Sequence, residues 1–481
     1  MNKKYYITTA IPYVNARPHV GFALELVQTD ALARYHRLLG EEVRAQTGAD
    51  ENAIKNAQAA EKAGVSTENF IKENSDLFEK LGKDLNCSFD DFIRTSNKIR
   101  HFPGVEKLWR ACKKDIYKKN YQGFYCVGCE AFLEEEDLVD GLCPEHQQKP
   151  NIVEEENYFF RLSGYQGFLD KLISSDELKI TPEARKNEII NFIRRGLSDF
   201  SVSRPSDRTK GWGVPVPDDP SQTIYVWFDA LANYITALGY GSSDESIYQK
   251  FWPADVHVIG KGINRFHSLY WPAMLFSAGL PLPKELFIHG YITINGQKIS
   301  KSLGNVIDPF DLIKQYGVDP LRYFFLSAVS PFTDSDFSHE RFKEVYNNDL
   351  ANGLGNLISR VAKLCEGADL SVPSFKKEDI TDFSAISPLN DYNFPEATRN
   401  IKDKISGADQ LLSETKPWLL LKDYSKKEEA KNVLLTLVKE IQEIAVLASS
   451  FLPLTSEKIL AQFAGPKVFS TTPLFPRTPE S

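Results

Sequence analysis

The 481-residue chain lacks any uninterrupted apolar run near the roughly 18 residues that a membrane-spanning helix needs. Its N-terminus, MNKKYYITTAI, has a charged start but no small-residue cleavage site, so it predicts a strand of the mature fold and not a signal peptide. The sequence also contains no internal repeat and no low-complexity tract. These absences favour a cytoplasmic protein without a membrane span.

Cysteine is scarce. The six cysteines are too few and too clustered for a disulfide framework in a chain of this length. The segment CVGCEAFLEEEDLVDGLCPEH instead spaces a C-x-x-C and a C-x-x-H pair about a dozen residues apart, as in tetrahedral zinc sites. Four protein ligands leave no open position, so we expect one structural Zn²⁺ on Cys126, Cys129, Cys143 and His146. The alternative is a group of buried free thiols.

Positive charge is in deficit, and the formal net charge of −8 argues against a protein that coats nucleic acid indiscriminately. A local basic surface on an acidic body is still compatible with this balance. The length exceeds what one core supports and indicates about two to four domains.

The first part of the chain alternates strand and helix patterns. YYITTAI is rich in β-formers, apolar residues recur at helical spacing from Val20 to Leu39, EEVRAQTG is a second strand, and later helices should stop at Gly64 and Gly82. This order predicts a parallel sheet. The pattern breaks into short strands and turns over residues 117–217, resumes in QTIYVWFDA, VHVIG and ELFIHGYITI, and becomes helical after about Ser335.

We therefore predict an α/β fold in which a parallel-sheet, Rossmann-type catalytic domain is split by an insertion. Its first half is residues 1–116, the inserted module with the zinc knuckle is 117–217, the second half with the loop described next is 218–335, and an α-helical bundle is 336–481.

Two motifs could hold a phosphate chain. In TTAIPYVNARPHVGFA a strand ends and His19 and Gly21 open a helix, whose free N–H groups favour an anion. In INGQKISKSLGNVIDP two lysines, Lys298 and Lys301, stand on a glycine-flanked loop that can close over a triphosphate. We expect both at the carboxyl ends of strands of one sheet. The alternatives are a capping histidine and a solvated surface loop.

Together with TGADEN, IYVWFDALANY, VIGKGINRFHSLYWPAML and YGVDPLRYFFL, these motifs make the chain similar to class I aminoacyl-tRNA synthetases over nearly its whole length. The resemblance is to the methionyl-tRNA synthetases in particular. It implies an ATP-dependent ligase that forms methionyl-adenylate from L-methionine and transfers the methionyl group to the 3′ end of initiator and elongator methionine tRNA. It also implies Mg²⁺ with ATP, and a monomer, because the chain stops soon after the helical domain.

The resemblance also implies site residues. The catalytic residues would be His19, Lys298 and Lys301, and the ATP site would be Pro12, His19, Gly21, Lys298, Ser300 and Lys301. The methionine site would be Ile11, Tyr13, Asp50, Trp227, Ala230, Leu231, Tyr234, Phe266, His267 and Trp271. Tyr234 and His267 would lie near the sulfur, which suits aromatic surroundings, and Asp50 would receive the α-ammonium group. The CAU anticodon would be read by Asn356, Arg360 and Trp418 in a helical anticodon-binding domain.

Core packing is the alternative for the aromatic group, and a helix cap, a solvated arginine and a core tryptophan are the alternatives for the last three. The chain departs from the family at Phe22, where a polar residue is usual, at Gly262, where aspartate is usual, and at Asn52, where histidine is usual. Two other functions stay open: another class I synthetase, or a non-catalytic tRNA-binding paralogue.

Overall fold

The structure, a computed structural model, describes residues 3–126, 131–133, 135, 138–144, 147–298 and 306–476. The chain divides into two compact units. The first comprises Met1–Thr29, Gly40–Lys83 and Ser88–His289, and the second comprises Asp30–Leu39, Asp84–Cys87 and Gly290–Ser481. Within the described ranges, no helix combines the length and the apolar character that crossing a membrane requires.

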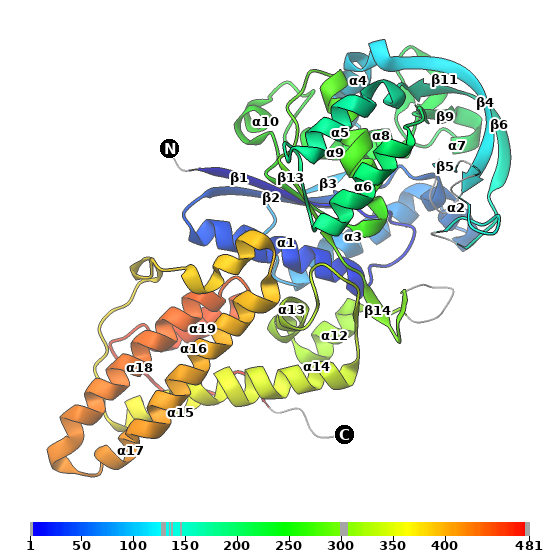
Figure 1. Cartoon of the computed structure of the whole chain (residues 1–481). Helices are drawn as coiled ribbons and strands as arrows, with labels where there is room; N and C mark the ends of the chain where they lie inside the picture. The colour runs from blue at the N-terminus through cyan, green and yellow to red at the C-terminus, as the bar shows by residue number, and fades with distance from the viewer. Residues whose placement is uncertain are drawn as a thin grey trace. The chain divides into compact units, whose positions relative to one another are not determined.

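A six-stranded sheet with every neighbour parallel forms the centre of the first unit (Figure 1). Its order is β3-β2-β1-β12-β13-β7, with bounds β1 (Lys4–Thr9), β2 (Glu42–Ala49), β3 (Asp91–Arg94), β7 (Lys179–Thr181), β12 (Val256–Gly260) and β13 (Glu285–His289). Strand β12 is buried at all of its residues, as expected for a strand covered on both faces. The predicted α/β fold with a parallel sheet is confirmed.

Glycine has two different roles at the predicted helix ends. Helix α1 (Val20–Leu38) and helix α2 (Ile54–Ala63) lie where the periodicity predicts, and Gly64 ends α2 in a left-handed conformation with φ of 71°. Gly82, however, lies inside α3 (Thr67–Asp84), so the predicted stop there is wrong. The apolar face of α3, with Phe78 and Leu81 buried, outweighs the ~1 kcal/mol that a helical glycine costs.

The inserted segment is more regular than its sequence indicates. Strands β4 (Ile116–Cys126) and β6 (Asn151–Phe160) pair along their lengths in a four-stranded antiparallel sheet, completed by β5 (Ala131–Leu133) and β8 (Phe200–Ser201). Two helices follow that the sequence analysis did not predict, α5 (Gln166–Ser174) and α6 (Glu183–Arg195). Strand β7 of the parallel sheet also comes from within residues 117–217.

Two apolar runs that the sequence assigns to the parallel sheet lie wholly or partly outside it. QTIYVWFDA contains the end of β11 (Asp219–Ile224), which pairs antiparallel with β9 (Ser203–Pro205) and β10 (Pro215–Val216). ELFIHGYITI breaks after β13 at Gly290, where a Cβ atom would lie 2.2 Å from the Thr333 carbonyl oxygen. Beyond the break, β14 (Ile292–Ile294) joins a separate sheet with β15 (Gln297–Lys298) and β16 (Ser335–Asp336). The lysine loop therefore follows β15, and the expectation that both motifs follow strands of one sheet is wrong.

The second unit is mainly helical after Asp336, as predicted. Its longer α-helices include α12 (Pro309–Tyr316), α13 (Val318–Ser327), α14 (His339–Val345), α15 (Asn356–Gly367), α16 (Phe394–Thr415), α18 (Lys427–Ala448) and α19 (Pro453–Phe463). The fully buried guanidinium of Arg322 pairs with Asp30 at 2.7 Å and donates to the carbonyl oxygens of Leu85 and Phe451. All four residues belong to this unit, so one side chain joins three separate segments of it.

Candidate active site

His19 and Gly21 lie together at the start of α1. The N–H groups of Phe22 and Ala23 donate to the His19 carbonyl oxygen, and the Gly21 N–H donates to His19 Nδ1 at 3.1 Å. Because Nδ1 accepts, a neutral imidazole carries its hydrogen on Nε2. A Cβ atom at position 21 would lie only 3.0 Å from the His19 ring, so glycine permits this close approach.

Asp50 lies beside the loop that precedes His19. Its N–H donates to the Pro12 carbonyl oxygen at 2.9 Å, and Tyr13 and Asp50 pair in a short parallel bridge. The Tyr13 ring meets the edge of Trp227, with ring centroids 6.2 Å apart. Ile11 lies near Gly48, whose Cβ would come within 3.0 Å of the Ile11 side chain. The ends of β1 and β2 thus bring the predicted ammonium ligand to one wall of the aromatic group.

That wall is built from two short helices. Trp227, Ala230 and Leu231 belong to α8 (Val226–Leu231), and Phe266 and His267 belong to the π-helical segment η5 (Phe266–Tyr270). The Trp227 and Phe266 rings stack with centroids 3.7 Å apart and an interplanar angle of 4°. Tyr234, on α9 (Asn233–Thr236), and Trp271 are both fully buried with centroids 6.0 Å apart.

Tyr234 and His267 form an uncharged polar pair among these rings. The Tyr234 hydroxyl lies 2.7 Å from His267 Nε2, and His267 Nδ1 lies 2.9 Å from the Ile263 carbonyl oxygen. Burial lowers the pKa of His267 to about 4 and raises the pKa of Tyr234 well above its ordinary value. A neutral imidazole must donate from Nδ1 to the carbonyl, so Nε2 accepts the tyrosine proton. The pair offers no charge to a ligand, which suits an apolar or thioether side chain.

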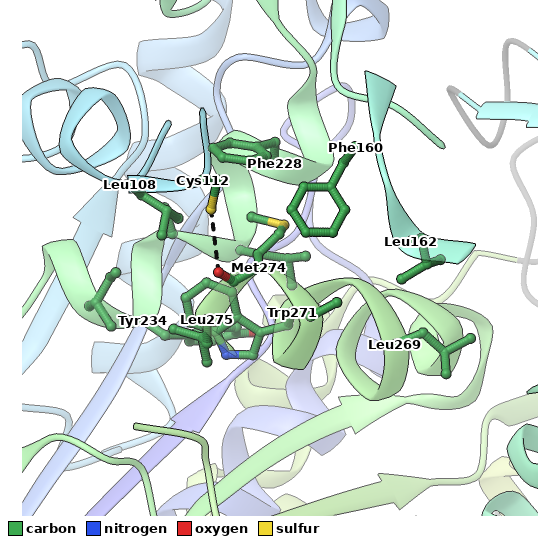
Figure 2. Packing of buried hydrophobic residues seen from close by; sticks show 14 of the residues in the cluster. Leu108, Cys112, Phe160, Leu162, Phe228, Tyr234, Leu269, Trp271, Met274 and Leu275 are labelled. Atoms are coloured by element: carbon green, nitrogen blue, oxygen red, sulfur yellow. Dashed lines mark hydrogen bonds between the residues drawn. The ribbon is translucent and has the colours of Figure 1, made fainter. Parts of the chain in front are cut away.

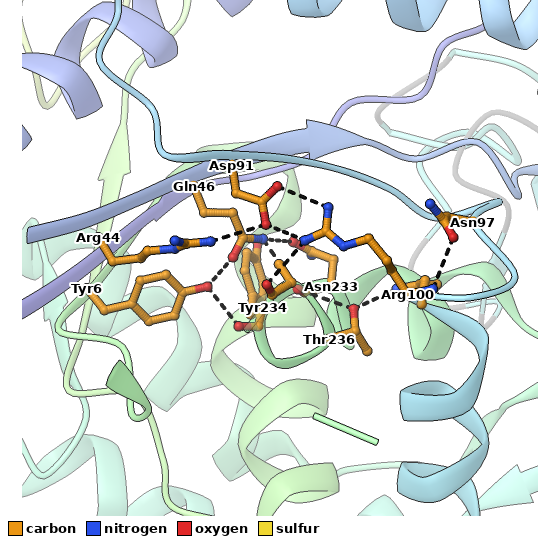
Figure 3. Close-up of polar contacts among 11 residues, drawn as sticks. Tyr6, Arg44, Gln46, Asp91, Asn97, Arg100, Asn233, Tyr234 and Thr236 are labelled. Carbon is orange, nitrogen blue, oxygen red and sulfur yellow. Dashed lines mark hydrogen bonds and ion pairs between the residues drawn. The ribbon is translucent and has the colours of Figure 1, made fainter. Parts of the chain in front are cut away.

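Side chains of the sheet strands contact the segment that carries Tyr234 (Figure 3). The Tyr6 hydroxyl lies 2.8 Å from the Tyr234 carbonyl oxygen and also contacts the Gln46 side chain, which in turn donates to Asn233 Oδ1 at 2.8 Å. Trp271 and Met274 of α11 (Trp271–Ser277) pack with Leu108 and Phe228 in the core, as Figure 2 shows. Tyr234 is therefore held by strand residues as well as by its own helix.

The predicted anticodon residues all belong to the second unit, and two of them lie close together. Asn356 is exposed at the first position of α15, and Arg360 follows one turn later. The Arg360 guanidinium lies 5.9 Å from the Trp418 ring centroid and pairs with Asp409 at 2.5 Å. Trp418, on α17 (Pro417–Leu420), is half-buried, so it is not a core tryptophan.

Comparison with known proteins identifies the family of this chain. A family profile described as tRNA synthetases class I (M) matches residues 5–152 and 146–362. The chain belongs to this family. Relatives named methionine–tRNA ligase include one from Clostridium acetobutylicum, 42% identical over 96% of this chain and 73% of its own length, and one from Thermotoga maritima, 41% identical over 95% and 74%.

A solved class I structure is similar throughout. Mycobacterium tuberculosis methionyl-tRNA synthetase in complex with methionyl-adenylate superposes with a TM-score of 0.90 at 38% identity, covering 99% of this chain and 100% of that chain. A second methionyl-adenylate complex from the same organism has a TM-score of 0.91 at 38% identity and covers 98% of this chain and 100% of that one.

Some of the residues assigned from the class I resemblance can be only partly placed. Lys298 is the last residue of β15, paired with Thr293, while Ser300 and Lys301 lie outside the described residues. Cys126 ends β4 and Cys143 is buried in a turn whose Gln147 N–H donates to the Cys143 carbonyl oxygen, whereas Cys129 and His146 also lie outside the described residues.

The three positions that differ from the residues usual in the class I family lie in different surroundings. Phe22 is buried and packs against Phe78, with ring centroids 4.9 Å apart, so position 22 contributes to the core of the first unit. Gly262 lies in the short η4 segment (Lys261–Ile263) between β12 and η5. Asn52 is buried and donates from Nδ2 to Asp229 Oδ2 at 2.7 Å.

Asp229 and His101 escaped the sequence analysis. Both are fully buried, and His101 Nε2 lies 2.6 Å from Asp229 Oδ1. A carboxylate in the otherwise apolar stretch VWFDALA is the signal that could have identified Asp229, since an ionisable residue at a buried position needs partners.

Proposed function

We propose that this chain is a methionine–tRNA ligase acting in protein biosynthesis. A carboxylate oxygen of L-methionine attacks the α-phosphorus of MgATP, the bond to the bridging oxygen of the β-phosphate breaks, and pyrophosphate leaves. A ribose hydroxyl of the terminal adenosine of methionine tRNA then attacks the carbonyl carbon of methionyl-adenylate. The hydroxyl loses its proton and AMP leaves with the bonding electrons.

The proposal needs no nucleophilic side chain, because the chemistry depends on orientation and charge stabilisation. In it, His19 donates from Nε2 to the α-phosphate, next to the N-terminal end of α1, together with the backbone around Pro12 and Gly21. Lys298, Ser300 and Lys301 bind the triphosphate, and Lys301 stabilises the transition state. Asp50 receives the α-ammonium group.

The uncharged Tyr234–His267 pair inside an aromatic wall is the observation that favours methionine as the amino acid. A thioether is apolar and makes favourable contacts with ring edges, whereas a charged or strongly polar side chain would be buried there without a counterpart. Ile11, Tyr13, Trp227, Ala230, Leu231, Phe266 and Trp271 complete the proposed methionine site.

The decisive experiment is methionine-dependent exchange of pyrophosphate into ATP, followed by charging of transcribed methionine tRNA. We expect exchange with methionine, and charging that falls when the CAU anticodon is changed. Exchange with leucine, isoleucine, valine or cysteine would indicate another class I synthetase. Retained tRNA binding without any exchange would indicate a non-catalytic paralogue.

We further propose that Asn356, Arg360 and Trp418 read the anticodon. The half-buried indole and the guanidinium 5.9 Å from it can stack on unpaired bases, and the exposed Asn356 amide can bond to a base edge. We also propose the four-part domain division given above and a monomeric state. The proposed location is the cytoplasm, where charged tRNA is used.

A structural zinc ion on Cys126, Cys129, Cys143 and His146 is part of the proposal. The two proposed ligands that the structure describes are buried thiols, Cys126 at the end of β4 and Cys143, which are suitable donors for a closed zinc site. When bound, zinc would stabilise this part of the inserted module and take no part in the reaction.

A further inference from the structure

Asn52 touches two buried carboxylates at once. Its backbone N–H donates to Asp50 Oδ1 at 3.3 Å, and its side-chain Nδ2 donates to Asp229 Oδ2 at 2.7 Å and to the Thr95 carbonyl oxygen at 2.9 Å. The residue is 6% exposed, and Asp50 and Asp229 are 2% and 0% exposed. Both hydrogens of the amide are therefore used, and its orientation is fixed.

Asp229 is itself held from the other side. His101 Nε2 lies 2.6 Å from Asp229 Oδ1, and His101 Nδ1 lies 2.7 Å from the Thr236 hydroxyl. A neutral ring that donates from Nε2 to the carboxylate can accept at Nδ1 from the Thr236 hydroxyl, which also lies 3.4 Å from the Asn233 carbonyl oxygen. The series runs from the turn after β2 to α8 and α9.

The elements at the two ends of this series carry the two sides of the methionine pocket. Asp50, at one end, is the proposed ligand of the α-ammonium group. Asp229 stands on α8 between Trp227 and Ala230, and Thr236 stands on α9 with Tyr234. A shift of the Asp50 turn relative to α8 would change the distance between the ammonium ligand and the side-chain pocket.

We propose that Asn52 and Asp229 are positioning residues that fix Asp50 for the α-ammonium group and so set the preference for an amine-bearing substrate. The inference rests on the proposed function, in which Asp50 binds that group. Neither residue touches the reacting atoms. Their contribution is to hold the Asp50 carboxylate at a set distance from the pocket that receives the methionine side chain.

The experiment measures KM for methionine, KM for ATP, kcat of pyrophosphate exchange, and inhibition by 4-(methylthio)butanoate, which is methionine without its amine. In Asn52→Leu we expect KM for methionine to rise by roughly 10- to 100-fold, the range of one hydrogen bond to a charged group. KM for ATP should change little, and inhibition by the amine-free analogue should be nearly unchanged. Asn52→His restores a donor towards Asp229 and should recover much of the loss.

Asn157→Leu is the matched control, because Asn157 is a fully buried asparagine on β6 whose Nδ2 donates to Glu155. It should lower stability without altering the preference for the amine. If Asn52→Leu does not fold, Asn52→Ser, whose side chain is too short to reach Asp229, should show the same selective rise.

Three outcomes are separable. No methionine-dependent exchange in the wild type overturns the proposed function. An active wild type with Asn52 variants that weaken methionine, ATP and the analogue equally, or none of them, overturns this inference alone. A selective loss with recovery in Asn52→His supports it.

Discussion

Lys301 and Lys298 are assigned unequal roles, and substitution can separate them. In Lys301→Ala we expect adenylate formation to slow by about 100-fold or more, because a group that acts on developing charge contributes mainly in the transition state. Methionine binding should stay close to normal. Single-turnover adenylate formation and equilibrium methionine binding measure the two effects, with Lys298→Ala as the comparison. Equal loss of rate and methionine affinity in Lys301→Ala would contradict its role.

His267 should make the stability of the first unit sensitive to acid. Burial lowers its pKa to about 4, while an unfolded histidine titrates near ~6.5. Between these pKa values the unfolded chain binds more protons than the folded chain, so the free energy of unfolding rises with pH. The contribution of His267 to stability is fully present above about pH 6.5 and is lost as the pH falls towards 4.

The expected loss between pH 7 and pH 5 from this residue is about 2 kcal/mol. Urea unfolding of the wild type and of His267→Gln at several pH values isolates it, because only the wild type carries the titrating ring. Parallel stability curves for the two proteins would show that the imidazole stays as protonated when folded as when unfolded.

At the scale of one residue, the sequence indicates residue types but not tautomers or hydrogen-bond partners. The aromatic residues and Tyr234 could be assigned from the resemblance, since residue types are written in the motifs. The tautomer of His267 depends on the Ile263 carbonyl and the contacts of Asn52 depend on Asp229, and no local pattern encodes either. The burial of Phe22 against Phe78 likewise depends on a residue distant in the sequence.

Two glycines give a matched test at the scale of one helix. Gly64 ends α2 at φ of 71°, whereas Gly82 lies within α3, and neither has an atom within 4 Å of an added Cβ. Gly64→Ala should destabilise the protein by about 1 kcal/mol, because alanine is strained in that conformation. Gly82→Ala should stabilise it by about 0.5–1 kcal/mol through helix propensity. Urea unfolding monitored by circular dichroism measures both, and shifts of the same sign would be inconsistent with these assignments.

The zinc proposal is also tested at the scale of one element. Metal analysis of the purified protein should find about one equivalent of zinc, as a closed four-ligand site requires. Cys126→Ser should lose the metal and make the inserted module easier to proteolyse, since metal binding contributes directly to local folding. Cys112→Ser, at a buried cysteine whose thiol donates to Met274, is the control that should keep the metal. Equal zinc content in both variants would exclude the site.

Elements with a local signal were predictable, and those defined by distant contacts were not. Strand β1 and helix α1 lie where the run of β-forming residues and the helical periodicity place them. The break at Gly290 is hidden in a continuous apolar run, because its cause is the approach of the Thr333 backbone from much later in the chain. Helices α5 and α6 were missed because the sequence analysis interpreted residues 117–217 as strands and turns.

Substitution of Arg322 tests what holds the segments of the second unit together. Its guanidinium is fully buried against Asp30 and donates to carbonyl oxygens of Leu85, Ser450 and Phe451. Arg322→Met removes the fully buried partner of Asp30 and leaves it the ion pair with Arg34 at 2.8 Å, so we expect a loss of about 3 kcal/mol, the lower end for a broken buried pair. The double variant Asp30→Leu with Arg322→Met should lose much less. Urea unfolding of both proteins tests this, and an equal loss in the two would mean that the charge pair itself is not the cause.

Strand β7 makes the insertion hard to remove. It forms one edge of the parallel sheet beside β13, yet it is encoded between the segment proposed to bind zinc and strand β12. A shortened gene that joined residue 116 to residue 218 would leave the backbone groups of β13 open along that edge, and open edges recruit other chains. A usable deletion must therefore cut only the β4–β6 ribbon and keep residues 179–181 in place, so the boundary for engineering lies inside the inserted segment.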